Sequence, residues 1–333
     1  MMSLSYFKPA GKAVFKDRFT TKANELLTDW EPGMTSDFGI VGVPLSKSSI
    51  SHSGAAFAPE AIRSVLQSYT TFSGSTNTEF RQPILDFGDI YMNPTDITEN
   101  QVRAYEGMLS ALQTEAATWW VILGGDHSIS YSAIKAFQEH YGKTGIIQFD
   151  AHHDLRNMED GGPTNGTPFR RLLEDRIIDG KHLVQIGIRD FTNAKEYLKY
   201  AKEQNVTVYT MEDVGRLSVI SLLEKELARL ADQVDIIYLS VDMDVLDQAF
   251  APGCPAIGPG GMDSKTLLEG ISFAAKHNKV QAMDIVEIDP TMDFRNMTSR
   301  LAAYILFQFM LQKINCGRSE EHTSELQSPD LIS

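Results

Sequence analysis

Short apolar runs alternate along this chain with longer helix-like segments, and this alternation is the main indication of its fold. The apolar runs predict strands at residues 38–45, 83–90, 120–124, 145–150, 182–188, 206–210, 235–241 and 280–287. The intervening segments predict helices at residues 59–69, 98–116, 128–141, 167–178, 192–204, 218–232, 264–277 and 297–314. Strict alternation of strands and helices is typical of a mainly parallel sheet covered by helices. We therefore expect an α/β protein with a sheet of about eight strands.

This pattern leaves the closure of the sheet open. Repeated strand–helix pairs fit a closed (β/α)₈ barrel as well as an open sheet, and periodicity cannot separate the two. In either architecture, ligands bind at the carboxyl ends of the parallel strands. Within the second predicted helix, Thr98 and Gln101 have the spacing of a capping box at its start.

Three of the predicted strands end in side chains that can bind metals. The run ending at Phe149 is followed by Asp-Ala-His-His-Asp, and the alternation of an extended segment places its first, third and fifth side chains on one side. Two other predicted strands run into Gly-Gly-Asp-His-Ser and Asp-Met-Asp. The candidate metal ligands are His127, Asp150, His152, Asp154, Asp242 and Asp244.

The chemistry of these ligands favours a pair of divalent cations. Four aspartates balance the four positive charges of two such ions. Oxygen-rich ligation with some imidazole suits Mn²⁺, and the lack of thiolates argues against a zinc–thiolate or iron–sulfur site. Two ions roughly 3.5–4 Å apart can hold a bridging water and lower its pKa. Aspartate is also common in turns, but turns need neither the Asp-x-Asp spacing nor the histidines.

Composition narrows the class of protein. The 333 residues, 42% of them hydrophobic, suffice for one large domain. A net charge of −14 argues against nucleic acid or an anionic membrane as partner. Two cysteines imply no disulfide framework and fit a reducing cytosol, so we expect a cytoplasmic protein. The first residues lack the apolar core of a signal peptide, and no stretch approaches the ~20 apolar residues of a membrane span.

The C-terminal segment differs from the rest of the chain. Residues 318–333 include Arg-Ser-Glu-Glu-His-Thr-Ser-Glu-Leu-Gln-Ser, which resembles the translation of a sequencing adapter. We interpret this segment as a non-native, disordered tail. A natural acidic tail is the alternative.

The chain as a whole resembles a known family. Gly-Gly-Asp-His-Ser, Asp-Ala-His-His-Asp and Ser-Val-Asp-Met-Asp-Val-Leu-Asp occur in the order typical of the arginase/agmatinase/formimidoylglutamase (ureohydrolase) family. The stretches most similar to the bacterial formimidoylglutamase branch are 42–63, 149–173, 251–261 and 286–300. The resemblance implies an open, three-layer αβα sandwich, with residues 1–317 as a single arginase-like domain. It also implies a division of the ligands in which His127 and Asp154 bind one manganese, His152 and Asp244 bind the other, and Asp150 and Asp242 bridge both.

The reaction implied by the resemblance is hydrolysis of N-formimidoyl-L-glutamate to L-glutamate and formamide. A dimanganese-bridged hydroxide would attack the amidine carbon. Glu287, in Val-Glu-Ile-Asp-Pro, matches the glutamate with which the family orients the cationic group of its substrates. Arginases carry a histidine in the loop after the Asp-Ala-His-x-Asp block, but Asn165 stands there in this chain and cannot shuttle a proton. Asp154 or a metal-bound water could then supply the proton to the leaving amine.

Charge decides which substrate of the family is expected. Formimidoylglutamate carries two carboxylates, arginine one and agmatine none. Arg156, two residues beyond Asp154, is our candidate for binding a carboxylate through its guanidinium. Asn165 and Glu287 complete the candidate substrate-binding set. Weaker candidates for the carboxylates are Lys47, Arg170, Arg171 and Arg189.

Other functions remain open at this point. Agmatinase or another guanidino-acid hydrolase would release urea instead of formamide, and an inactive metal-binding regulator could have the same fold. The complete ligand set favours an enzyme with a small anionic amidine as substrate, and we expect a homo-oligomer. His153 has the wrong parity to join the ligands, and Asp126 and Asp247 are interpreted as carboxylates that orient them.

Overall fold

A nine-stranded sheet forms the centre of the protein. The computed structural model describes residues 17–326, with side chains described as far as Cys316. The strands of the main sheet are β1 (Leu27–Asp29), β2 (Ser36–Val43), β5 (Ile84–Asp89), β6 (Ala117–Gly124), β7 (Thr144–Phe149), β8 (Leu183–Ile188), β9 (Thr207–Thr210), β10 (Ile236–Asp242) and β11 (Val280–Val286). Two short strands, β3 (Phe72–Ser73) and β4 (Thr78–Glu79), form a separate antiparallel pair.

The main sheet is parallel and open. Its strand order is β1-β5-β2-β6-β11-β10-β7-β8-β9, and every neighbouring pair is parallel. Strands β1 and β9 are the two edges and do not pair with each other. This order excludes the barrel and confirms the expected open α/β architecture.

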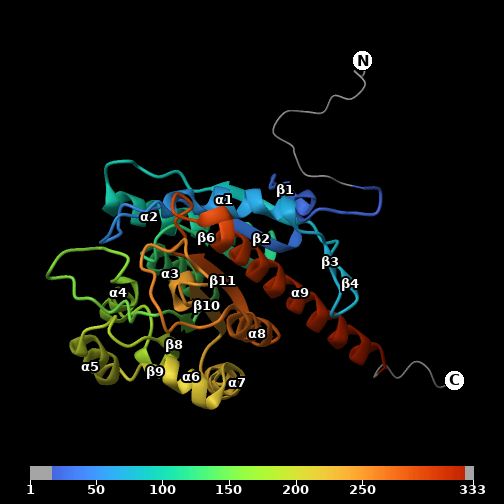
Figure 1. The fold of residues 1–333 in the computed structure, drawn as a ribbon. Helices are drawn as coiled ribbons and strands as arrows, with labels where there is room; N and C mark the ends of the chain where they lie inside the picture. Colours follow the sequence, from blue (N-terminus) through green and yellow to red (C-terminus); the bar gives the residue numbers. More distant parts are fainter. Residues whose placement is uncertain (1–16, 327–333) are drawn as a thin grey trace.

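Helices cover both faces of the sheet (Figure 1). One layer consists of α2 (Ile97–Gln113), α3 (Ile129–Tyr141), α4 (Pro168–Glu174) and α5 (Lys195–Glu203). The other consists of α1 (Ala58–Val65), α6 (Met211–Leu217), α7 (Val219–Ala231), α8 (Ser264–Ala275) and α9 (Met297–Leu326). Each layer packs on its own cluster of buried hydrophobic residues, so the protein has three layers.

The central strands are buried on both faces. Every residue of β7 and β10 is buried, as is typical of parallel strands between two helical layers. Ile146 packs in one core and Ile147 in the other, and Tyr238 and Leu239 divide in the same way. This packing fixes the strands, so side chains that follow their carboxyl ends have defined positions.

All predicted strands and helices correspond to observed ones, but the structure also contains elements that were not predicted. Strand β1, the β3–β4 pair and helix α6 were not predicted; the first two are short and partly exposed, and α6 directly follows β9. The predicted capping box is wrong, because Asp96 caps α2 by accepting a hydrogen bond from the Glu99 N–H at 2.9 Å. Thr98 lies inside the first turn.

The C-terminal helix is longer than expected. Helix α9 continues through Leu326, so the backbone of residues 318–326 is helical where the sequence indicated disorder. Extending an existing helix costs little, and consecutive glutamates are good helix formers. The remaining part of the expected tail, 327–333, lies outside the described residues. The non-native origin of this segment stays a prediction.

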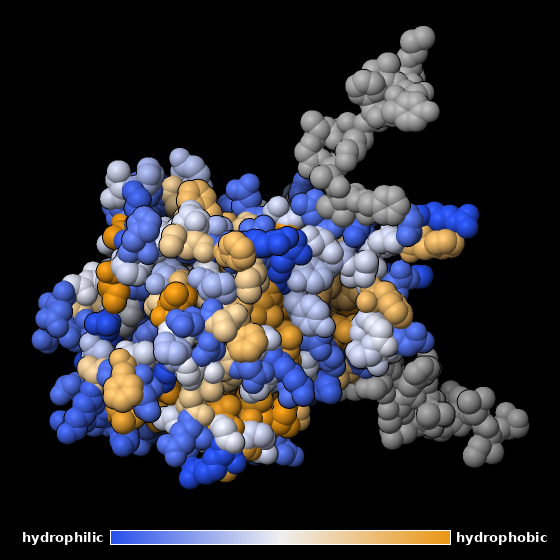
Figure 2. All heavy atoms as spheres, viewed as in Figure 1, coloured by the Kyte–Doolittle hydropathy of each residue, from blue (hydrophilic) through white to orange (hydrophobic). Residues whose placement is uncertain are grey.

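The surface is mainly hydrophilic on the face that Figure 2 shows, with apolar residues gathered over α8. Within residues 17–326, no helix combines the length and apolar character needed to cross a membrane.

Candidate active site

Four neighbouring strands, β6, β11, β10 and β7, bring the candidate residues together at one edge of the sheet. His127 lies just beyond β6, Asp150 follows β7, Asp242 ends β10 and Glu287 follows β11. Because these strands are parallel, their carboxyl ends meet at the same edge. Residues as far apart in sequence as His127 and Glu287 are therefore in hydrogen-bond contact.

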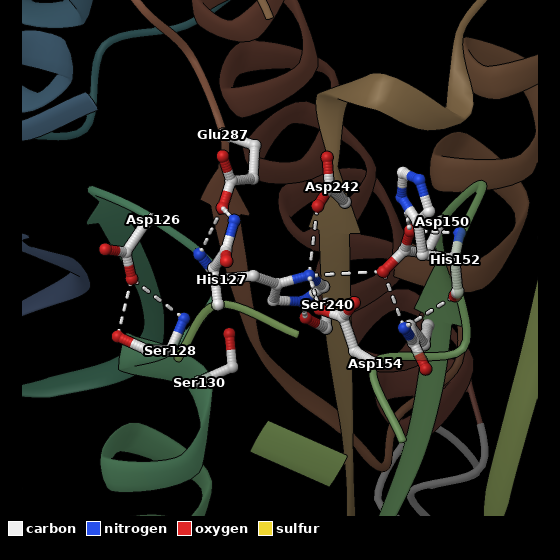
Figure 3. Close-up of polar contacts among 12 residues, drawn as sticks. Asp126, His127, Ser128, Ser130, Asp150, His152, Asp154, Ser240, Asp242 and Glu287 are labelled. Atoms are coloured by element: carbon white, nitrogen blue, oxygen red, sulfur yellow. Dashed lines mark hydrogen bonds and ion pairs between the residues drawn. The ribbon is translucent and has the colours of Figure 1, made fainter. Parts of the chain in front are cut away.

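The first group of candidate ligands surrounds His127. Its Nδ1 lies 3.2 Å from Asp150 Oδ2, 3.0 Å from Asp154 Oδ2 and 3.0 Å from Asp242 Oδ2 (Figure 3). Each of the four residues offers an atom within 4.8 Å of the others. One cation could therefore contact all four.

A second group lies beside the first and shares Asp150 with it. His152 Nδ1 lies 3.0 Å from Asp244 Oδ2 and 3.5 Å from Asp150 Oδ1. The two oxygens of Asp150 thus face different histidines, which is the arrangement of a bridging carboxylate. The structure brings all six predicted ligands into these two groups.

The hydrogen bonds of His127 show how its ring could bind a cation. Ser240 Oγ donates to Asp284 Oδ1 at 2.9 Å, so its oxygen is left to accept from His127 Nε2–H at 2.9 Å. Nδ1 then has a free lone pair, and it is buried without a hydrogen-bond partner among the described residues. Burial lowers the pKa of His127, but without a cation its three carboxylate neighbours raise it well above the ordinary value. The negative charge of the site can therefore be balanced either by protonation or by bound cations. The buried Nδ1 atom of His127 is suited to bind a metal ion.

Crowding perturbs the carboxylates as well. Burial, followed by the charge of Asp150, raises the pKa of Asp154 to about 6. Burial and the charge of Asp244 raise the pKa of Asp242 well above its usual range. The Asp244 charge in turn raises the pKa of His152 to about 12. Binding of divalent cations would displace these protons and remove the repulsion.

Glu287 is a buried carboxyl group next to this centre. Its Oε1 accepts hydrogen bonds from the His127 N–H at 2.8 Å and from Asn165 Nδ2 at 3.0 Å. Burial, followed by the charge of Asp126, raises the pKa of Glu287 to about 8. Glu287 and Asp154 both have left-handed backbones, with φ of 60° and 52°. Such strain in residues other than glycine is often found at functional sites.

A cavity of about 230 Å³ opens above the two ligand groups. Its lining residues are Ile50, Ser51, His152, Asp154, Arg156, Asn165, Gly166, Thr192, Asn193, Tyr197, Asp242, Asp244, Pro255, Ala256 and Glu287. The exposed Arg156 lies over the ring of Tyr197, with Nη1 3.4 Å from the Tyr197 hydroxyl. Among the described lining residues, Arg156 alone carries a permanent positive charge.

The weaker cationic candidates do not line this cavity. Arg189 is buried and donates to the carbonyls of Gly258 and Asp244, so it holds a loop to the ligand-bearing backbone. Arg171 lies over Tyr131, Arg170 over Tyr200, and Lys47 is exposed. The structure therefore separates these four from Arg156.

Three residues that the sequence analysis did not count as ligands, His153, Asp126 and Asp247, lie outside the two ligand groups. His153 Nδ1 lies 2.6 Å from Gln185 Oε1. Asp126 accepts hydrogen bonds from the Ser128 backbone and hydroxyl. Asp247 accepts from two loop amides, those of Ala249 and Gly260, and shapes the loop after β10.

Several site residues were not identified from the sequence. Ser240 and Gln148 stand two positions before Asp242 and Asp150, so strand parity alone could have pointed to them. Asp284, Asn193 and Tyr197 carried no comparable signal, because their approach to the site depends on the packing of distant segments.

Comparison with known proteins identifies the family. The model of the Arginase family matches residues 36–312. Formimidoylglutamase from Halalkalibacterium halodurans is 54% identical over 308 residues, which cover 92% of this chain and 97% of the relative. The crystal structure of formimidoylglutamase from Bacillus subtilis has a TM-score of 0.88 and 47% identity, over 92% of this chain and 96% of that one. Formiminoglutamase from Trypanosoma cruzi, solved with Mn²⁺, shares the fold with a TM-score of 0.80 and 22% identity, over 88% of this chain and 98% of that one. This chain therefore belongs to the arginase family.

Proposed function

We propose that this chain hydrolyses N-formimidoyl-L-glutamate to L-glutamate and formamide. The observation that carries the proposal is a complete set of six candidate ligands beneath a cavity whose exposed cation is Arg156. The strong similarity to formimidoylglutamases over nearly the whole chain supports the same substrate.

The six ligands would hold two Mn²⁺ ions. His127 and Asp154 would hold one ion and His152 and Asp244 the other, with Asp150 and Asp242 as the ligands that the two ions would share. Carboxylate oxygens with imidazole suit Mn²⁺. When bound, the metal pair supplies a water activated for attack at neutral pH.

Glu287 would orient the amidinium group of the substrate. Its carboxylate is held from two sides by the His127 N–H and by Asn165, so it has a defined direction at the cavity wall. A buried carboxylate gains most from a cationic partner that replaces its lost hydration. The amidinium carbon is then presented to the ligand groups.

Asp154 is our candidate for moving a proton to the leaving amine. Hydrolysis breaks the bond between the amidine carbon and the α-nitrogen of glutamate, and that nitrogen must gain a proton. The Asp154 side chain is 10% exposed, whereas those of Asp150, Asp242 and Asp244 are at most 3% exposed. Asp154 is thus the carboxylate ligand most accessible from the cavity.

Arg156 would bind one of the substrate carboxylates. A guanidinium can pair with a carboxylate through two parallel hydrogen bonds. The same positive charge disfavours agmatine, which is a dication and remains the alternative substrate. We further propose a cytoplasmic, homo-oligomeric enzyme, supported by the buried Cys254, which forms no disulfide among the described residues, and by exposed apolar side chains such as Phe191.

A substrate comparison tests this proposal. Protein loaded with Mn²⁺ is supplied separately with formimidoylglutamate, agmatine, arginine and guanidinobutyrate, and formamide and urea are quantified. We expect kcat/KM to be highest for formimidoylglutamate, with formamide as product. Preferential release of urea from a guanidino compound would contradict the proposal.

A further inference from the structure

A chain of buried side-chain hydrogen bonds ends on Asp150. Gln148 Nε2 donates to Asp150 Oδ2 at 2.6 Å, and Gln185 Nε2 donates to Gln148 Oε1 at 2.7 Å. His153 Nδ1 lies 2.6 Å from Gln185 Oε1. His153 is 2% exposed and the other three residues are fully buried, so water cannot replace these contacts.

The direction of every hydrogen bond in this chain follows from its end. A carboxylate can only accept, so the amide nitrogen of Gln148 must face Asp150 and its oxygen must face Gln185. Gln185 must then donate to Gln148 and accept from His153, whose Nδ1 must carry the hydrogen. All three donors point toward Asp150, and hydrogen bonds aligned in this way strengthen one another.

The backbone holds the two amides in place. Gln148 and Gln185 are register partners on the neighbouring strands β7 and β8. Gln185 Nε2 also donates to the His153 carbonyl at 2.8 Å. The Asp150 Oδ2 atom that receives the last hydrogen bond is the one that lies 3.2 Å from His127 Nδ1. The chain therefore acts on the oxygen that faces the first ligand group.

We infer that His153 is a positioning residue, which orients the bridging carboxylate of Asp150 through Gln185 and Gln148. The inference rests on the proposed dinuclear centre. Hydrogen-bond partners of this kind fix the direction of a metal ligand, and their loss typically lowers metal affinity roughly ten- to a hundredfold.

The test measures Mn²⁺ binding directly, without turnover. Metal-free full-length protein is titrated with Mn²⁺ by calorimetry, and bound metal is counted by mass spectrometry. Gln148→Met removes the donor to Asp150 and is expected to weaken binding roughly ten- to a hundredfold. His153→Leu should weaken binding less, and the double variant should bind no more weakly than Gln148→Met, because His153 acts only through Gln148.

Two further variants separate positioning from general damage to the core. His153→Asn places an amide donor near the Nδ1 position and should restore most of the affinity. His182, which is also buried but lies before β8, provides the matched control, and His182→Leu should leave affinity unchanged. Thermal unfolding with saturating Mn²⁺ reports whether each variant folds. If His153→Leu does not fold, the two single variants His153→Asn and Gln148→Met complete the test.

The outcomes distinguish this inference from the proposed function. If the wild type binds two Mn²⁺ and Gln148→Met binds them with the affinity of the wild type, the inference is overturned and the function is left intact. The same holds if the losses of Mn²⁺ affinity in the two single variants add up in the double variant. A wild-type protein that binds no Mn²⁺ would overturn the proposed dinuclear centre itself.

Discussion

An acidic and a basic side chain lie at different places in the cavity, and each matches one end of the proposed substrate. Glu287 is buried at the wall next to His127, whereas Arg156 is exposed beside Tyr197. The Glu287 carboxylate matches an amidinium and the Arg156 guanidinium matches a carboxylate. Each residue can therefore be tested by a change that removes its charge.

Glu287→Gln keeps the shape of the side chain and an oxygen that can still accept from His127 N–H. The loss of the anion should lower kcat/KM for formimidoylglutamate by roughly ten- to a hundredfold, because a charge-assisted contact is lost. Steady-state kinetics and a metal count check this, and both metals should be retained. Glu269→Gln, at a glutamate near Lys265 on α8, is the control. Unchanged kcat/KM in Glu287→Gln would rule out the orienting role.

Arg156→Ala should lower kcat/KM for formimidoylglutamate by roughly ten- to a hundredfold for the same reason. Arg156→Lys keeps the charge but not the paired donors, so it should restore part of the loss. With N-formimidoyl-L-glutamine as substrate, both variants should have nearly the kcat/KM of the wild type if Arg156 binds the side-chain carboxylate. Normal turnover of formimidoylglutamate by Arg156→Ala would show that another group binds the carboxylates.

At the scale of elements, the ends of the strands position the candidate ligands, and strands and helices together form the two hydrophobic cores. Burial of whole strands made β7 and β10 easy to predict, and the ligands at their ends followed from parity. Helix α6 was not predicted because it follows β9 without an intervening loop, and strand β1 was not predicted because three residues are too few for a periodic pattern. The two hydrogen bonds that link Asp284, Ser240 and His127 form only because their strands are neighbours in the sheet. The order of the strands could not be predicted from the sequence.

Helix α9 contains a buried lysine with a testable effect on stability. Lys313 is 3% exposed and donates to the His277 carbonyl at 2.8 Å, and burial lowers its pKa to about 7. The unfolded chain has a normal lysine pKa of about 10.4 and binds the proton more tightly, so stability should rise as pH increases from 7 toward 10. The increase between pH 7 and 9 should be roughly 2 kcal/mol.

Denaturant unfolding of the wild type and Lys313→Met at pH 7 and pH 9 measures this effect. The wild type should gain stability relative to Lys313→Met as pH rises, because the variant has no proton to lose at this position. Lys276→Met, at an exposed lysine after α8, is the control, and its unfolding free energy should change with pH as that of the wild type does. A pH-independent difference between the wild type and Lys313→Met would contradict a lowered pKa.

At the scale of the whole molecule, the three-layer fold presents a cavity over the two candidate metal groups. The alternation of strands and helices predicted a parallel sheet, whereas the open form of the sheet was expected only from the family resemblance of the three motifs. The sequence favoured Arg156 but could not exclude the weaker candidates, since Arg189, Arg170 and Arg171 find their partners only in the folded chain.

Removal of residues 318–333 should leave the enzyme intact, since the family match ends at residue 312. A chain ending at Gly317 is expected to keep kcat/KM and the midpoint of thermal unfolding of the full-length protein. A large fall in either would show that the segment belongs to the functional protein.

The central claim is that two metal ions and the residues around them hydrolyse a linear amidine. Metal-free protein is titrated with Mn²⁺ while the release of formamide from formimidoylglutamate is followed. Our account predicts no turnover without metal and a rise that levels off at two equivalents per chain. Full turnover by the metal-free protein, or no release of formamide at saturating Mn²⁺, would contradict it.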